Sequence, residues 1–336
     1  MKLRFSSRHF VVAILALLAV NACAYDSESD GIYHNAYAYD FESDGIYYNV
    51  SSEKDRTVEV TSGGGSTFSK YRGNIVIPDG VFNDGRTYTV TSINDYAFCY
   101  CDALTSVDLS STSLTTIGAH AFTGSNALTS VEFPASLTTI EGFAFSNCDA
   151  LTSVDLSSTS LTTIEGRAFS NCHALTRVEL PASLTSIDDN VFSECTSLSK
   201  LTVDEDNPVF TSRNNVLYSK NLDTLVCYPT GLDTDVVIPD MVRFVGYGGA
   251  FPGKVSAVYC QPQTPPAVLV LPLSGTFSDD VLMNAVLYVP IGTKAAYMQV
   301  DPWRNFRNIE ETDFSTVGIN GVTAQSEPLV TVRDGK

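Results

Sequence analysis

The residues best suited to acid–base chemistry are the histidines, and only His34, His120 and His173 lie beyond the first 24 residues. Histidine is the side chain most often used as a general acid or base. His120 and His173 stand in turn-like positions, where we expect them to face solvent. No serine or cysteine stands in a nucleophile-elbow motif that would pair with them. The sequence therefore predicts no catalytic residues and a protein that is not an enzyme.

Cysteine is the second candidate for chemistry, because thiolates bind metal ions and oxidise to disulfides. The chain holds 8 cysteines, and Cys99 and Cys101 have the wrong spacing for a zinc knuckle. Four cysteines each lie three residues after a recurring phenylalanine, and Ser125 holds that place in the remaining unit: Cys101, Cys148, Cys172 and Cys195. We interpret this place as a small residue packed beneath a turn. Vertical disulfides between neighbouring units, about 4.8 Å apart, are the alternative.

Three acidic stretches could supply oxygen ligands for calcium: residues 188–190, 204–207 and 279–280. None has the spacing of a calcium loop with its glycine and terminal glutamate. The glycines at 63–65 lack the following lysine of a phosphate-binding loop. We interpret the acidic stretches as solvated turns, and the sequence predicts no metal site and no cofactor.

His120, His173 and the four recurring cysteines all lie in a repeat that runs through residues 97–201. The words Leu-Thr-Ser-Val and Ala-Phe recur in phase in units of 23 or 24 residues, and the shorter units replace Ser-Ser-Thr by Pro-Ala. Self-similarity at such a period indicates a solenoid, in which stacked units share one core. Short alternating apolar runs bounded by Ser, Pro and Gly predict two short strands per coil rather than helices.

Units of the form L-T-S-V-x-L-P-x-S-L-T-S-I-x-x-x-A-F-x-x-C resemble the BspA-like leucine-rich repeat family of bacterial cell-surface proteins, over about residues 45–310. The fold we expect is mainly β, a leucine-rich-repeat solenoid of 23/24-residue coils with β-rich caps. The resemblance implies display on a host-associated bacterium and adhesin-like binding of host proteins, matrix proteins among them.

The chain divides into five predicted segments. They are a signal peptide at 1–24, a duplicated N-terminal segment and β-rich cap at 25–91, regular repeats at 92–203, divergent repeats with a C-terminal cap at 204–310, and a polar tail at 311–336. Within the C-terminal cap we expect strands at 255–259 and 285–290, a short helix at 294–300, and Trp303 closing the end of the core. In the N-terminal cap, residues 83–86 read Asn-Asp-Gly-Arg, a hairpin-turn signal.

Export is predicted by the first residues. Lys2, Arg4 and Arg8 precede an apolar run at 10–20, which is too short to span a bilayer and typical of a signal peptide. Cleavage after Ala24 would free Tyr25. Alternatively, a loose lipobox would make Cys23 a lipid-anchored first residue. We expect an extracellular protein, either secreted or on the outer surface of a bacterium, with no transmembrane helix.

A candidate binding face follows from the strand word Leu-Thr-Ser-Val-Asp-Leu, which points its Leu and Val inward and leaves Thr and Asp outward. Stacking then predicts a row of hydroxyls beside a row of carboxylates. The face consists of Thr105, Asp108, Thr129, Glu132, Thr152, Asp155, Thr176 and Glu179. Like charges on neighbouring strands repel, so the row is either a solvated surface or a site for a basic or amide-rich partner.

The function that we expect is binding of host or other extracellular macromolecules by a monomer. A formal net charge of −18 argues against nucleic acid as the partner. Two other functions stay open. A glycan-binding module of a nutrient-uptake system would need exposed aromatic rings, and a purely structural surface spacer would need no site.

Overall fold

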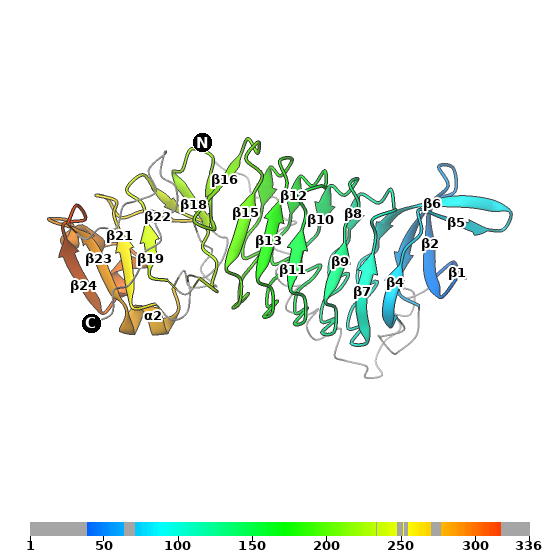
Figure 1. Ribbon diagram of the computed structural model, residues 1–336, viewed down its shortest axis with the longest axis horizontal. Coiled ribbons are helices and arrows are strands. Elements are labelled where there is room, and N and C mark those ends of the chain that lie inside the picture. Colours follow the sequence, from blue (N-terminus) through cyan, green and yellow to red (C-terminus); the bar gives the residue numbers. More distant parts are fainter. Residues whose placement is uncertain are drawn as a thin grey trace, which may run out of the picture.

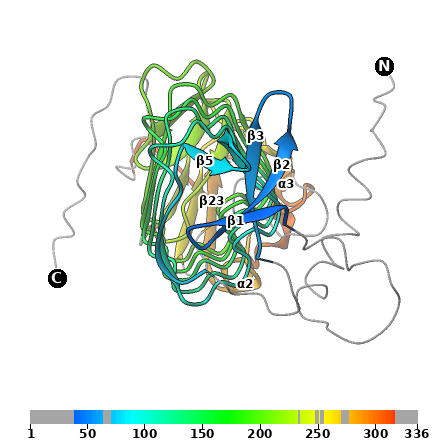
Figure 2. The same cartoon turned by 90° about the vertical axis from the view of Figure 1, so that its right-hand side faces the viewer.

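The computed structural model describes residues 39–63, 71–232, 234–246, 251, 255–269 and 277–316. These residues wind into an elongated solenoid whose coils stack along the long axis of the molecule (Figure 1). Viewed along that axis, the coils lie over one another (Figure 2). The expected signal peptide, its two alternative processing sites and most of the polar tail lie outside the described residues.

Each regular coil contributes two short strands, one to each long side of the solenoid. Strands with identical sequence words pair in parallel and in register, as where Thr139 and Ile140 face Thr163 and Ile164. The predicted mainly-β leucine-rich-repeat solenoid is confirmed. The strands of this region are β7 (Leu104–Asp108), β8 (Thr116–Ile117), β9 (Ser130–Glu132), β10 (Thr139–Ile140), β11 (Ser153–Asp155), β12 (Thr163–Ile164), β13 (Arg177–Leu180), β14 (Ser186–Ile187) and β15 (Lys200–Val203).

Hairpins cover the N-terminal end of the stack. The predicted turn at residues 83–86 is confirmed, because Asp84 and Gly85 have φ values of 48° and 79° and join β5 to β6. Positive φ at both central residues defines the hairpin turn that Asp-Gly favours. The cap strands are β1 (Phe41–Ser43), β2 (Ile46–Ser52), β3 (Thr57–Thr61), β4 (Gly73–Val76), β5 (Gly80–Asn83) and β6 (Arg86–Ile93).

The C-terminal part keeps the stacking but breaks the repeat. The strands are β16 (Phe210–Arg213), β17 (Val216–Ser219), β18 (Thr224–Cys227), β19 (Val236–Ile238), β20 (Phe244–Val245), β21 (Ala257–Cys260), β22 (Ala267–Val268), β23 (Val286–Pro290) and β24 (Asn308–Thr312). The expected short helix is α3 (Lys294–Tyr297), which is followed by a 3-10 turn at Trp303–Asn305. Both expected strands form, as β21 and β23.

One helix of this part, α2 (Asp279–Asn284), contradicts the interpretation of Asp279 and Asp280 as a solvated turn. The Ser278 side chain accepts a hydrogen bond from the Val281 amide and caps the helix. Both aspartates lie in its first turn, where negative charge complements the helix dipole.

The core of the regular coils is a column of parallel phenylalanine rings. Phe145 is fully buried and stacks on Phe122 and Phe169, with ring centroids 4.9 and 5.1 Å apart. Phe98 and Phe192 extend the column at both ends. The C-terminal part has a second hydrophobic core, which contains Trp303. Trp303 is fully buried and donates its indole N–H to the Pro266 carbonyl at 2.9 Å, as expected for a residue that closes the end of the core.

Candidate functional site

The expected binding face lies on the side of the solenoid that β7, β9, β11 and β13 build (Figure 1). Its four threonines are exposed, and each follows a buried leucine at the start of its strand word. Its carboxylates follow a buried valine. Asp108 lies opposite Glu132, and Asp155 lies opposite Glu179, on neighbouring parallel strands.

Two of the four threonines bind the backbone of the preceding coil. The amide and the hydroxyl of Thr129 both donate to the Thr105 carbonyl, each at 2.9 Å. Thr176 binds the Thr152 carbonyl in the same way, at 2.9 and 3.0 Å. The Thr105 hydroxyl donates to the Asn74 side chain at 2.7 Å. These three hydroxyl hydrogens are already used within the fold, so Thr105, Thr129 and Thr176 can offer a partner oxygen acceptors only.

The two aspartates are held by the turn that follows them. Asp108 accepts hydrogen bonds from the amide and the hydroxyl of Ser110, at 2.9 and 2.6 Å. Asp155 accepts the same pair from Ser157, at 3.0 and 2.6 Å. These bonds stabilise the charged form and lower the pKa of both carboxyl groups below the ordinary value. Both aspartates therefore present a fixed negative charge.

The two glutamates stand where this turn is impossible. Two residues after Glu132 and Glu179 the chain has Pro134 and Pro181, which have no amide hydrogen to donate. Glu132 is exposed, and the half-buried Glu179 forms an ion pair with Arg177 two residues earlier on the same strand. The alternation of Asp and Glu along the row follows from the alternation of long and short coils.

A second row on this face was missed by the sequence reasoning. It lies two residues before the carboxylate row, on the same side of each strand, and consists of Ser106, Ser130, Ser153, Arg177 and Lys200. The signal was present in the strand alternation, which puts residues two apart on one face. We call the two rows together with the threonines the β-face. Its cations lie only at the end nearest β15.

His120 lies in a different column, on a corner of the solenoid, and is half-buried rather than fully solvent-facing as expected. Its ring stacks between Tyr96 and Phe143, with centroids 4.9 and 4.8 Å away. The Thr123 hydroxyl donates to the Phe143 carbonyl, so it accepts from His120 Nδ1, 3.2 Å away. Burial lowers the pKa of His120, and the charge of Asp95 opposes that shift.

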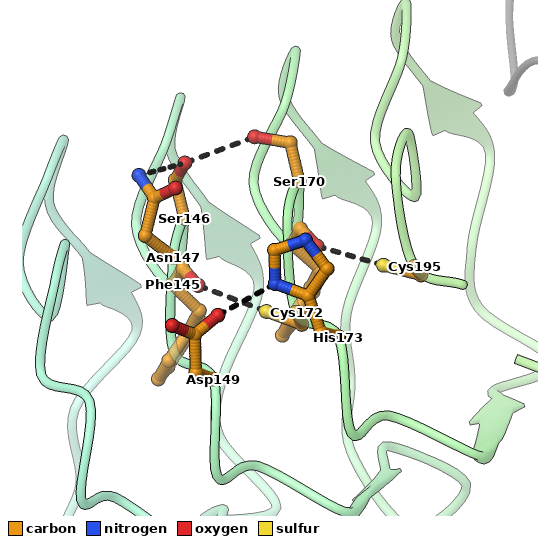
Figure 3. Close-up of polar contacts among 9 residues, drawn as sticks. Phe145, Ser146, Asn147, Asp149, Ser170, Cys172, His173 and Cys195 are labelled. Carbon is orange, nitrogen blue, oxygen red and sulfur yellow. Dashed lines mark hydrogen bonds and ion pairs between the residues drawn. The ribbon is translucent and has the colours of Figure 1, made fainter. Parts of the chain in front are cut away.

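His173 is exposed, as expected, and its Nδ1 lies 2.7 Å from an Asp149 carboxylate oxygen in the preceding coil (Figure 3). An Asp–His pair orients the imidazole, as in hydrolase triads. No serine or cysteine in the described part of the chain is hydrogen-bonded to the His173 ring. The structure does not bring His120 and His173 together into one site.

The repeated cysteines occupy a buried ladder beneath the turns. The thiols of Cys148, Cys172 and Cys195 donate to the carbonyl of the phenylalanine one coil earlier, at 3.2, 3.1 and 3.0 Å (Figure 3 shows the last two). Ser125 makes the same bond to Phe98 at 2.6 Å. The interpretation as a small residue beneath a turn is confirmed. The seven described cysteines are buried and are not joined in disulfides, so the alternative of vertical disulfides is not realised in this part of the chain.

Among the residues described, no group of three or more His, Cys, Asp or Glu side chains is arranged to hold a metal ion. In the acidic stretch 204–207, Asn207 is buried, which sequence reasoning missed. Its side-chain amide donates to the Pro181 and Leu184 carbonyls, and its oxygen accepts from the amides of Val209 and Phe210. Asn207 therefore ties the last regular coil to the divergent region.

Two groups of half-buried aromatic rings are stacked ring on ring. Tyr259 and Tyr288 are half-buried on β21 and β23 and stack against each other, with centroids 5.0 Å apart and an interplanar angle of 10°. The corner column of Tyr96, His120 and Phe143 is stacked in the same way. Stacked rings cover each other's faces, which a sugar would need for packing.

Comparison with known proteins identifies the repeat. A model of the BspA type leucine rich repeat region matches residues 91–223 in six copies. Among solved structures, a leucine rich repeat protein of T. pallidum is 29% identical, with 48% of this chain and 70% of that chain covered and a TM-score of 0.40. The pneumococcal vaccine antigen PcpA is 19% identical, with 74% and 81% covered and a TM-score of 0.48.

A leucine-rich repeat protein from Bacteroides ovatus ATCC 8483 is 22% identical, with 75% of this chain and 71% of that chain covered and a TM-score of 0.45. No curated protein matches the chain. In the described residues, no helix has the length and apolar character needed to cross a membrane. Residues 91–223 are therefore a BspA-type leucine-rich repeat region of six copies.

Proposed function

We propose that this chain is a secreted or surface-displayed protein that binds a basic extracellular macromolecule through its β-face, without catalysis. The observation that carries the proposal is the row of carboxylates, one per coil, on strands held in register by the stack. Asp108 and Asp155 are fixed by their serines, so little side-chain entropy is lost when a partner binds them.

The charge of the regular coils supports a basic partner. Between Arg86 and Arg167 the chain contains no lysine or arginine and eight aspartates and glutamates. A surface of one sign attracts a partner of the opposite sign and speeds their encounter. The family's setting on bacterial surfaces supports a host extracellular protein, such as a matrix protein, as that partner.

Location and assembly complete the proposal. We propose export by the N-terminal segment, with a mature chain that begins at Tyr25 and acts as a monomer. A lipid anchor at Cys23 is the alternative route to the surface. Mass spectrometry of the protein purified from the bacterium that makes it distinguishes the two routes. A diacylated Cys23 would overturn cleavage before Tyr25.

The experiment that tests the function compares two variants of the mature chain against purified host extracellular proteins. The face variant combines Asp108→Asn, Glu132→Gln, Asp155→Asn and Glu179→Gln. The control variant removes the same number of charges from other surfaces: Asp102→Asn, Glu141→Gln, Asp149→Asn and Glu165→Gln. Asn and Gln keep the acceptor oxygens, so both variants should fold, which circular dichroism checks.

We expect the unmodified chain to bind a basic protein of the panel with salt-sensitive affinity. The face variant should bind at least about tenfold more weakly, because several opposed charges are lost together. The control variant should keep its affinity within about threefold. Equal affinity of the face variant and the unmodified chain would place the site elsewhere and overturn the proposal.

A further inference from the structure

The β-face has a regular spacing that a partner must match. The spacing can be measured between the phenylalanine rings of the core column. The step from the β7 coil to the β9 coil is 4.8 Å, the next step to the β11 coil is 4.9 Å, and the next to the β13 coil is 5.1 Å. The step to the β15 coil is 5.8 Å. Successive strands that carry the carboxylates are therefore about 5 Å apart, as expected for neighbouring strands.

An α-helix lying along the solenoid axis matches these steps. A helix rises about 1.5 Å per residue, so residues three, seven and ten positions apart advance about 4.5, 10.5 and 15 Å on one face. These advances stay within about 1 Å of one, two and three coil steps. An extended strand repeats its side chains on one face every 6.6 Å or so, and it loses register after the first coil.

The side chains of the β-face also suit a helix. The small side chains of Ser106, Ser130 and Ser153 form a row beside the carboxylate row, and the two rows together make one strip of surface. The rows are two residues, about 6.6 Å, apart along each strand, within the 10–12 Å width of a helix. This strip ends at Arg177 and Lys200 in one direction. In the other direction it ends at Val76, which is 62% exposed and lies opposite Asp108 on the neighbouring strand.

The charges of the β-face fix a direction. Asp108, Glu132 and Asp155 are the acidic part, since Glu179 is already paired with Arg177. Lys200 lies one coil beyond Arg177 and is exposed. A partner should therefore carry cations over three successive coils and an acidic group two coil steps, or about two helical turns, further along.

We propose that the partner presents a basic amphipathic α-helix, with cations at positions one, four and eight and an acid near position fifteen, along the solenoid axis. The proposal rests on the function proposed above and names its partner class. Extended basic peptides, which lack this register, are the competing partners.

The test uses two labelled, alanine-rich peptides of equal composition with the mature chain. The helix-register peptide has lysines at its first, fourth and eighth positions and a glutamate at its fifteenth. The strand-register peptide has lysines at its first, third and fifth positions and the same glutamate. We expect fluorescence anisotropy to show about tenfold tighter binding of the helix-register peptide, lost in the face variant. Lys200→Glu should weaken it about threefold, and replacing the peptide's glutamate by lysine should restore that loss.

The outcomes separate the two proposals. If both peptides bind equally and both lose affinity in the face variant, the β-face is a basic-partner site but the helix inference is wrong. If neither peptide binds, or binding is the same in the face variant and the control variant, the inference fails together with the proposed function.

Discussion

Phe145→Ala is the sharpest test of the stacked core. The ring is fully buried, stacks on Phe122 and Phe169 at 4.9 and 5.1 Å, and meets Phe133 edge-on at 5.9 Å. Truncating a buried phenylalanine costs about 3–5 kcal/mol through lost burial and the cavity left behind. Each lost aromatic pair accounts for about 0.5–1.5 kcal/mol beyond burial, so the expected loss lies at the upper end of that range.

Urea unfolding followed by circular dichroism measures the loss in the free energy of unfolding. Phe82→Ala is the matched control, because Phe82 is 68% exposed on the β5 hairpin and should change stability by less than about 0.5 kcal/mol. A loss below about 1 kcal/mol for Phe145→Ala would refute the column as a major source of stability. It would also mean that neighbouring coils support each other far less than the solenoid predicts.

Other predictions concern the cysteine ladder and two titrating groups. Cys172→Ser should cost less than about 1 kcal/mol in urea unfolding, because serine keeps the donor to the Phe145 carbonyl, whereas Cys172→Val should cost about 1–3 kcal/mol. Burial lowers the folded pKa of His120, so its contribution to the free energy of unfolding is present above about pH 6.5 and is lost as the pH falls through the folded pKa. His120→Phe should reduce the loss of unfolding free energy between pH 7.5 and 5. An unchanged dependence of that free energy on pH would contradict the prediction. The pKa of Glu141 is raised by burial and by Asp95 and Glu165, so Glu141→Gln should raise the melting temperature at pH 7 and lose that advantage as the pH falls and Glu141 takes up a proton.

The fold could be predicted because its determinants are local and repeated. The apolar pattern that contains the buried residues Leu104 and Val107 recurs in each coil. Its five in-phase copies therefore define which side of every coil is buried. The position of Phe145 followed from that phase alone. The Asp-Gly turn at residues 83–86 carries its own conformational signal, because glycine at its second central place accepts a positive φ without strain.

The corners of the coils could not be predicted from residue type. Each coil has a left-handed residue two places before its phenylalanine, with a φ value of 56° to 59°: Tyr96, His120, Phe143, Arg167 and Asn190. Only asparagine among these types favours that conformation. Tertiary stacking decides it, because each of these amides except that of Asn190 donates to a carbonyl of the next coil.

The candidate site could be predicted in position but not in chemistry. Outward Asp108 follows from strand alternation around buried Val107, and outward Thr105 follows buried Leu104 in the repeated word. The same alternation should have identified Ser106 and the cations that continue its row. The bonds from Ser110 to Asp108 depend on the turn that follows the strand. The pairing of Glu179 with Arg177 depends on two long side chains meeting on one strand, which no periodicity specifies.

Carboxylate footprinting would test the central claim most directly. The mature chain is labelled at its carboxylates by carbodiimide coupling, with and without a bound basic partner, and analysed by mass spectrometry after chymotrypsin digestion. We predict that the partner protects Asp108, Glu132 and Asp155 but leaves Asp102 and Glu165, on other surfaces of the same coils, as reactive as before. Equal protection of both sets, or protection of the second set alone, would contradict the β-face as the binding surface.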